Sequence, residues 1–212
     1  MGRNPNGESL GRRGVTAYLS GNSKQLVLDM GFNVGTVAIR GKPVEEIHAV
    51  LHVRATNKRQ QEPEAPVVAA ALPSGWYQLY INDRTYPNND DLRSLSLNAE
   101  LIFLDVCETA MVSGAACWQN GKEMWSIAHD SWRSHDDLVI QGTAPACLAR
   151  IVQRLGMLQK DKADADYAFD VPVDVTCDLT GFRYDGNPNG YPVDEFIVLE
   201  RIQPPRKWWR VW

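Results

Sequence analysis

The chain has 212 residues, of which 44% are hydrophobic and 23% are charged, and its formal net charge is −4. This is an ordinary globular composition, long enough for one domain with a hydrophobic core, so a fibrous or wholly disordered protein is excluded. No apolar run approaches the roughly 20 residues that a membrane-spanning helix needs.

The N-terminal residues 1–14 are polar and rich in Gly, Asn and Arg, which predicts a flexible extension. No apolar stretch follows their charges, so we expect no signal peptide and a cytoplasmic location. A single domain is predicted over residues 15–203, followed by a Trp-rich C-terminal tail at 204–212. The widely spaced cysteines form no CxxC pair and are interpreted as reduced core thiols: Cys107, Cys117, Cys147 and Cys177.

The first elements of the domain are short. Residues 15–19 and 25–30 are predicted strands, and Pro43 lies in the first turn of a predicted helix. Residues 57–66 are charged, contain prolines and lack large apolar side chains, which predicts an exposed loop.

Stronger signals follow from residue 76 onward. Residues 76–82 alternate and are rich in aromatic side chains, which predicts a strand. Asp90 is a candidate N-cap for a short helix over 91–96. The nearly continuous apolar run 101–106 is typical of a strand that is buried on both faces.

A hairpin is predicted over residues 111–130. Its strands, 111–119 and 122–130, flank Asn120-Gly121, a dipeptide that tolerates positive φ at both turn positions. A two-residue turn would set Trp125 opposite Ala116, so that a large side chain meets a small one.

The remaining elements complete an α+β pattern. They comprise a strand at 138–141, a helix from Pro145 to about 160, a shorter helix from Pro172 to Gly181, and a last strand at 196–202. We therefore predict a mainly antiparallel sheet with a central hairpin (111–130) and two to four helices packed on it.

His129-Asp130 is the most enzyme-like local feature, because a histidine near a carboxylate can act as a general base. Neighbouring strand residues point to opposite faces, however, and the expected register places Cys117 on the face away from His129. The sequence has no GxSxG, phosphate-loop or HExxH motif. We therefore predict no catalytic residue.

His48 and His52 are four residues apart on the predicted helix, a spacing that can chelate zinc. No third ligand is nominated by the sequence, so we predict neither a metal site nor a cofactor.

The segment 161–195 contains nine acidic and two basic residues, a net charge of −7. Four of its aspartates recur every fourth residue and are candidate contacts for a basic protein surface: Asp166, Asp170, Asp174 and Asp178. Pro172 is expected to interrupt this row, and Asp170 is expected to cap the helix that follows. Trp208 and Trp209 in the tail are further candidate partner contacts, because buried Trp side chains anchor interfaces.

Three segments resemble a group of small bacterial proteins: PSGWYQLYIND (73–83), CETAMVSGAACWQNGKEMWSIAHD (107–130) and DADYAFDVPVDVTCDLTGFRYD (164–185). The shared pattern is PSGWY…WxxGxxxWxxxHD…DYxFDVPVxxxxxLTGFRxD, and it covers neither the N-terminal third nor the tail. Proteins of this group resemble immunity proteins that protect bacteria from toxins delivered between cells, including by type VI secretion. The resemblance implies that role and supplies no catalytic residue.

We therefore expect a cytoplasmic, non-enzymatic immunity protein that binds a cognate toxin and occludes it, with no nucleic-acid or membrane partner. The oligomeric state stays open. One alternative is a small hydrolase or metal-dependent enzyme that uses His129 or the pair His48 and His52. Another is a chaperone or adaptor for a secreted effector.

Overall fold

A computed structural model of the protein describes residues 31–83, 86–134, 136–161, 165–186 and 190–202. The predicted strands at 15–19 and 25–30, the N-terminal extension and the tail with Trp208 and Trp209 lie outside these residues.

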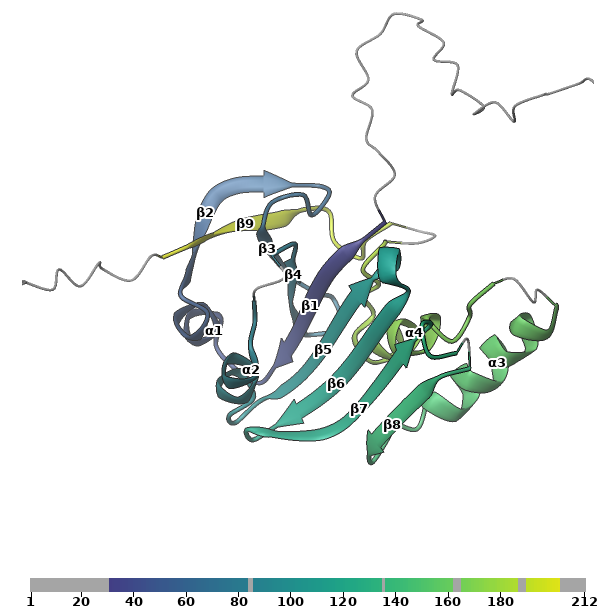
Figure 1. Cartoon of the computed structure of the whole chain (residues 1–212). Coiled ribbons are helices and arrows are strands. Elements are labelled where there is room, and N and C mark those ends of the chain that lie inside the picture. Colours follow the sequence, from purple (N-terminus) through teal and green to yellow (C-terminus); the bar gives the residue numbers. More distant parts are fainter. Residues whose placement is uncertain (1–30, 84–85, 135, 162–164, 187–189, 203–212) are drawn as a thin grey trace, which may run out of the picture. The chain divides into compact units, whose positions relative to one another are not determined.

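The described strands form one nine-stranded sheet in which every pairing is antiparallel (Figure 1). The strand order is β2-β9-β3-β4-β1-β5-β6-β7-β8, so β1 is the middle strand and β2 and β8 are the edges. The strands are β1 (Asn33–Arg40), β2 (Val53–Gln60), β3 (Val67–Ala71), β4 (Tyr77–Ile81), β5 (Glu100–Cys107), β6 (Val112–Gln119), β7 (Lys122–Asp130), β8 (Leu138–Gly142) and β9 (Phe196–Arg201).

The helices pack against this sheet and confirm the predicted α+β class. They are α1 (Val44–Val50), α2 (Asn89–Leu95), α3 (Leu148–Asp161) and α4 (Asp170–Thr180), with a 3-10 turn, η1 (Glu108–Ala110). None of the helices in the described ranges is both long enough and apolar enough to cross a membrane.

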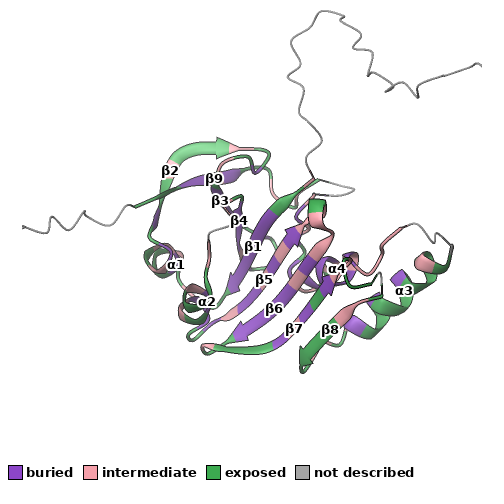
Figure 2. Cartoon of the chain, viewed as in Figure 1, coloured by how far each residue is buried: buried purple, intermediate pink, exposed green. Residues whose placement is uncertain are grey.

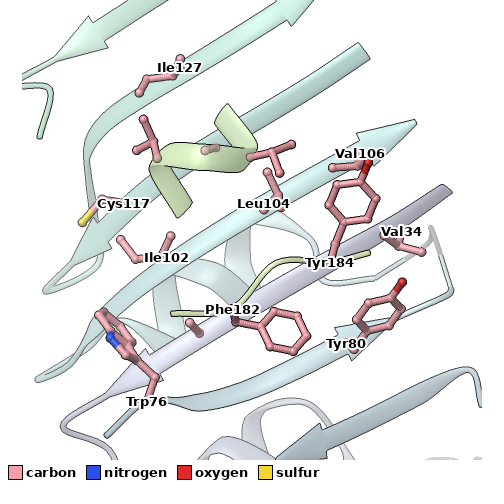
Figure 3. Packing of buried hydrophobic residues seen from close by; sticks show 14 of the residues in the cluster. Val34, Trp76, Tyr80, Ile102, Leu104, Val106, Cys117, Ile127, Phe182 and Tyr184 are labelled. Carbon is pink, nitrogen blue, oxygen red and sulfur yellow. The ribbon is translucent and has the colours of Figure 1, made fainter. Parts of the chain in front are cut away.

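Each face of the sheet carries its own hydrophobic core. On one face, the sheet packs against α3, α4 and the segment after α4, which contributes Phe182 and Tyr184 (Figure 3). On the other face, Ile47 and Leu51 of the α1 region and Leu92 and Leu95 of α2 pack over the middle of the sheet. Antiparallel sheets commonly bury one face and expose part of the other.

Two predicted boundaries are wrong. Residues 57–60 belong to β2 and not to a loop, because an edge strand exposes most of its side chains and can be as polar as a loop. The helix α2 begins at Asn89, and its N-cap is Asn88, whose side chain accepts from Asp90 and Asp91 backbone N–H groups.

The start of α4 is also different from the prediction. Asp170 is its first residue and not its cap, and the N-cap is Phe169. Pro172 lies in the first turn, where backbone N–H groups have no partner within the helix, so it does not interrupt α4. The predicted C-terminal end is confirmed, because Gly181 adopts φ +79 directly after the helix.

The predicted hairpin is confirmed as β6 and β7, but its predicted register is wrong. Gln119 faces Lys122 and Trp118 faces Glu123, and the register then shifts by one residue. Trp125 consequently faces Cys117 and not Ala116, and Met124 is the extra residue of a β-bulge. The shift places Trp125, Ile127 and His129 on the face that α3 and α4 cover.

Trp125 is 6% exposed within this core. We expect Trp125→Ala to lower the free energy of unfolding by about 3–5 kcal/mol, because truncation leaves a large cavity. The control Leu97→Ala, at a side chain 49% exposed, should change it by less than about 0.5 kcal/mol. Urea unfolding of the two variants measures both values, and an unchanged stability of Trp125→Ala would contradict the register.

Candidate partner-binding face

His129 is fully enclosed between the sheet and the start of α4. Its side chain is 0% exposed, and its Nε2 lies 2.9 Å from Oδ2 of Asp166, a carboxylate that is 5% exposed. Its Nδ1 lies 2.6 Å from the carbonyl oxygen of Asp137, which can only accept, so Nδ1 donates. Both ring nitrogens are therefore engaged within the chain, and Asp166 has a structural contact.

The expected separation of His129 from Cys117 is wrong, because the β-bulge brings both onto one face. Ser113 faces His129 across the strand pair, but its hydroxyl donates to the carbonyl oxygen of Phe169 at 2.7 Å. Burial raises the pKa of the Cys117 thiol to about 11, which keeps it protonated near neutral pH. These groups hold α4 on the sheet and present no activated nucleophile.

His48 and His52, the pair considered as an alternative metal site, do not lie on one helical face. The helix α1 ends at Val50, and His52 lies beyond it in the left-handed region with φ 50. His48 Nε2 lies 2.7 Å from the Tyr77 hydroxyl, and burial lowers the pKa of His48. No group of three His, Cys, Asp or Glu side chains suited to a metal occurs among the residues that the structure describes.

The aspartates of α4 lie on one unbroken helix, but arginines neutralise them. Arg183 donates to Asp170 at 2.8 Å and to Asp185 at 3.0 Å, and it also pairs with Asp174. These four side chains are between 15% and 29% exposed, so water screens the pairs incompletely. Burial raises the pKa of Asp170, and the hydrogen bond from Arg183 opposes that rise.

Two further arginines reach α4 from α3. Arg154 pairs with Asp174, and Arg150 pairs with Asp178 at 2.5 Å. The predicted acidic row is thus a network of ion pairs that joins α3, α4 and the segment after α4. A role of these aspartates in partner binding stays a prediction, and Asp178 is the most exposed of the three on α4.

The three segments of the family-like pattern meet in space. The Ser74 hydroxyl donates to the carbonyl oxygen of Thr180 at 2.5 Å, joining the PSGW turn to the end of α4. The contact of His129 with Asp166 joins the second segment to the third. In the described residues these pattern positions therefore make contacts that support the fold.

Among the residues that the structure describes, a different surface is exposed on the side of the sheet that carries α1 and α2. On this side Leu101 of β5 and Ala116 and Trp118 of β6 are buried in the core with these helices, but other described residues from β5 to β8 are partly or fully exposed. Figure 2 shows the exposed residues on β7 and β8. We name this surface the bare face. It consists of Asp105, Gly114, Ser126, Ala128 and Val139, all partly or fully exposed.

The bare face is unusual for a solvated sheet surface, because its centre has small side chains where long polar ones are common. A shallow depression of about 210 Å³ lies beside α2 and includes Phe103, Trp118 and Glu123. Among the described residues that line it, two are acidic, Asp105 and Glu123, and none is basic. Trp118 is 7% exposed, and its indole Nε1 has no hydrogen-bond partner within the described residues.

Fold and surface together define an α+β protein with an antiparallel sheet, one face of which is partly exposed in the part of the chain that the structure describes. Comparison with protein-family models gives no match. Comparison with curated proteins gives none either, and the same holds for solved structures. The sequence prediction missed the bare face, because only the true register of β6 and β7 shows which residues share it.

Removing Arg183 should test the ion-pair network. We expect Arg183→Gln to destabilise the fold by about 3 kcal/mol at pH 7, because it removes the cation that three partly buried carboxylates share. The matched control Arg150→Gln, at a side chain 64% exposed, should cost less than about 1 kcal/mol.

This effect should depend on pH with a definite sign. Without Arg183, the pKa of Asp170 in the folded protein lies further above its value in the unfolded chain. The loss of stability in Arg183→Gln is therefore complete above the folded pKa, and it shrinks as the pH falls from the folded pKa to the unfolded pKa. Urea unfolding at neutral and at acidic pH measures this, and an equal deficit at both would contradict the assignment.

Proposed function

We propose that the protein is an immunity protein that binds a cognate bacterial toxin and occludes its active site. The toxin acts in the cytoplasm, for example as a nuclease delivered by type VI secretion. The resemblance of residues 73–185 to proteins of this kind motivates the proposal.

The bare face is the observation that carries it. Its small side chains, Gly114, Ser126 and Ala128, let an element of a partner approach the backbone of the sheet closely. The acidic lining, with Asp105 and Glu123, is complementary to the basic surface that a nuclease needs to hold its substrate.

The geometry of the histidines gives less support to the enzymatic alternative. Both nitrogens of His129 are engaged in contacts with Asp137 and Asp166, away from solvent. His48 and His52 do not share one helical face, and His48 Nε2 contacts the Tyr77 hydroxyl. An effector chaperone would bind a protein too, and a functional test distinguishes it.

Ala128→Arg should weaken toxin binding by about ten-fold or more and abolish growth protection against a co-encoded toxin, because it adds bulk and positive charge at the centre of the bare face. The matched control is Ala55→Arg on the opposite edge strand, at another exposed alanine. Binding is measured by calorimetry, and protection by co-expression. Full protection by Ala128→Arg would contradict the proposal, and a requirement for toxin export without protection would identify a chaperone.

Charge-reversal variants distinguish two candidate toxin-binding surfaces, the bare face and the aspartates of α4. Glu123→Lys should lower the association rate at low salt, with a smaller effect at high salt, because rim charges steer the encounter. Asp178→Lys is the comparison, since Asp178 is exposed and lies on the other side of the sheet. Stopped-flow association rates at two salt concentrations decide which surface the toxin approaches, and a slower rate for Asp178→Lys alone would favour α4.

A further inference from the structure

The two edge strands of the sheet differ in their protection against pairing with another strand. The edge strand β2 contains Arg54, Lys58 and Arg59, and its pairing with β9 is irregular between Ala55 and Arg59. Charged side chains and bulges are the devices by which sheet edges avoid pairing with other chains. This edge is therefore protected.

The opposite edge strand, β8, has neither device. Its sequence LVIQG has no charged residue, and its five pairs with β7 keep one regular register. Val139 is 38% exposed and Ile140 is 45% exposed, and alternation places them on opposite faces of the strand. No other strand among the described residues pairs with the outer edge of β8 (Figure 1).

We propose that β8 pairs with β8 of a second copy of this chain, in antiparallel orientation about a two-fold axis at Ile140. The strand is complementary to itself in this arrangement. Ile140 faces Ile140 of the second copy, Val139 faces Gln141, and Leu138 faces Gly142, so a large side chain meets a small one at each end. A single closed interface results, as a two-fold axis requires.

The ends of β8 are also complementary. Trp132, which is 83% exposed, precedes the N-terminal end of β8. Met124, which is 45% exposed, lies at the C-terminal end of β8, where its carbonyl oxygen accepts a hydrogen bond from the Thr143 N–H. Antiparallel pairing brings opposite ends together, so Trp132 of one copy approaches Met124 of the other. Aromatic and thioether side chains make favourable contacts of this kind.

Exposed apolar side chains beside β8 add to the area that this arrangement would bury. A stable interface needs about 800 Å² per partner, which a five-residue strand alone does not supply. The exposed Trp132 and Met124 enlarge the buried apolar area beyond the strand itself.

The experiment measures self-association of the full chain by sedimentation equilibrium over a range of concentrations, with no toxin present. The unmodified chain should form a dimer. Ile140→Lys should weaken it by about ten-fold or more, because two like charges meet at the axis. Asn57→Lys, an exposed position on the protected edge, is the matched control and should leave the dimer unchanged.

Two further variants keep the test independent of folding. Gln141→Lys changes a side chain that is already polar and exposed, and Trp132→Ala removes one that is 83% exposed, so both should keep the thermal midpoint of dilute protein while weakening the dimer. Amide hydrogen exchange of β8 should slow as the protein concentration rises. A chain that stays monomeric, or a dimer unaffected by both Ile140→Lys and Gln141→Lys, would overturn the proposal. Toxin protection is a separate readout, because self-association does not rest on the proposed function.

Discussion

The register of β7 depends on one inserted residue, and most of the structure depends on that register. Side chains of a strand alternate with a period of two, so the bulge at Met124 transfers every following residue of β7 to the other face. Trp125, Ile127 and His129 thereby enter the core under α3 and α4, and Ser126 and Ala128 turn to the bare face. The buried histidine and the small-residue surface have the same geometric cause.

The helix α4 is held by contacts that come from distant parts of the chain. Ser74 reaches its C-terminal end, Ser113 reaches Phe169 at its start, and Arg183 lies across its exposed side. These positions lie within the family-like segments, so a chain that shares the pattern is expected to share this attachment of α4. Such a pattern indicates a common fold more directly than a common reaction.

Features encoded by neighbouring residues were predictable from the sequence. Asn120 and Gly121 both have positive φ, and Gly181 ends α4, as their residue types indicate. The prediction failed where partners are far apart. The strands β1 and β3 were not predicted, the bulge has no local signal, and nothing near Asp174 and Asp178 announces Arg154 and Arg150 on another helix. The same non-local contacts decide which of the described sheet residues are exposed.

The two proposed surfaces meet at β8, and this has a consequence for binding stoichiometry. The two-fold axis between antiparallel strands stands perpendicular to the sheet, so a dimer would place both bare faces on the same side of one continuous sheet. Two toxin molecules would then bind side by side, or one wide partner would span both copies. Val139 belongs to the bare face and lies next to the axis, so a change there affects both surfaces. Ala128 lies one strand inside the edge, and Ile140 lies on the opposite face of β8. Substitutions at these two positions therefore act on different surfaces and can show whether dimer formation and toxin binding are coupled.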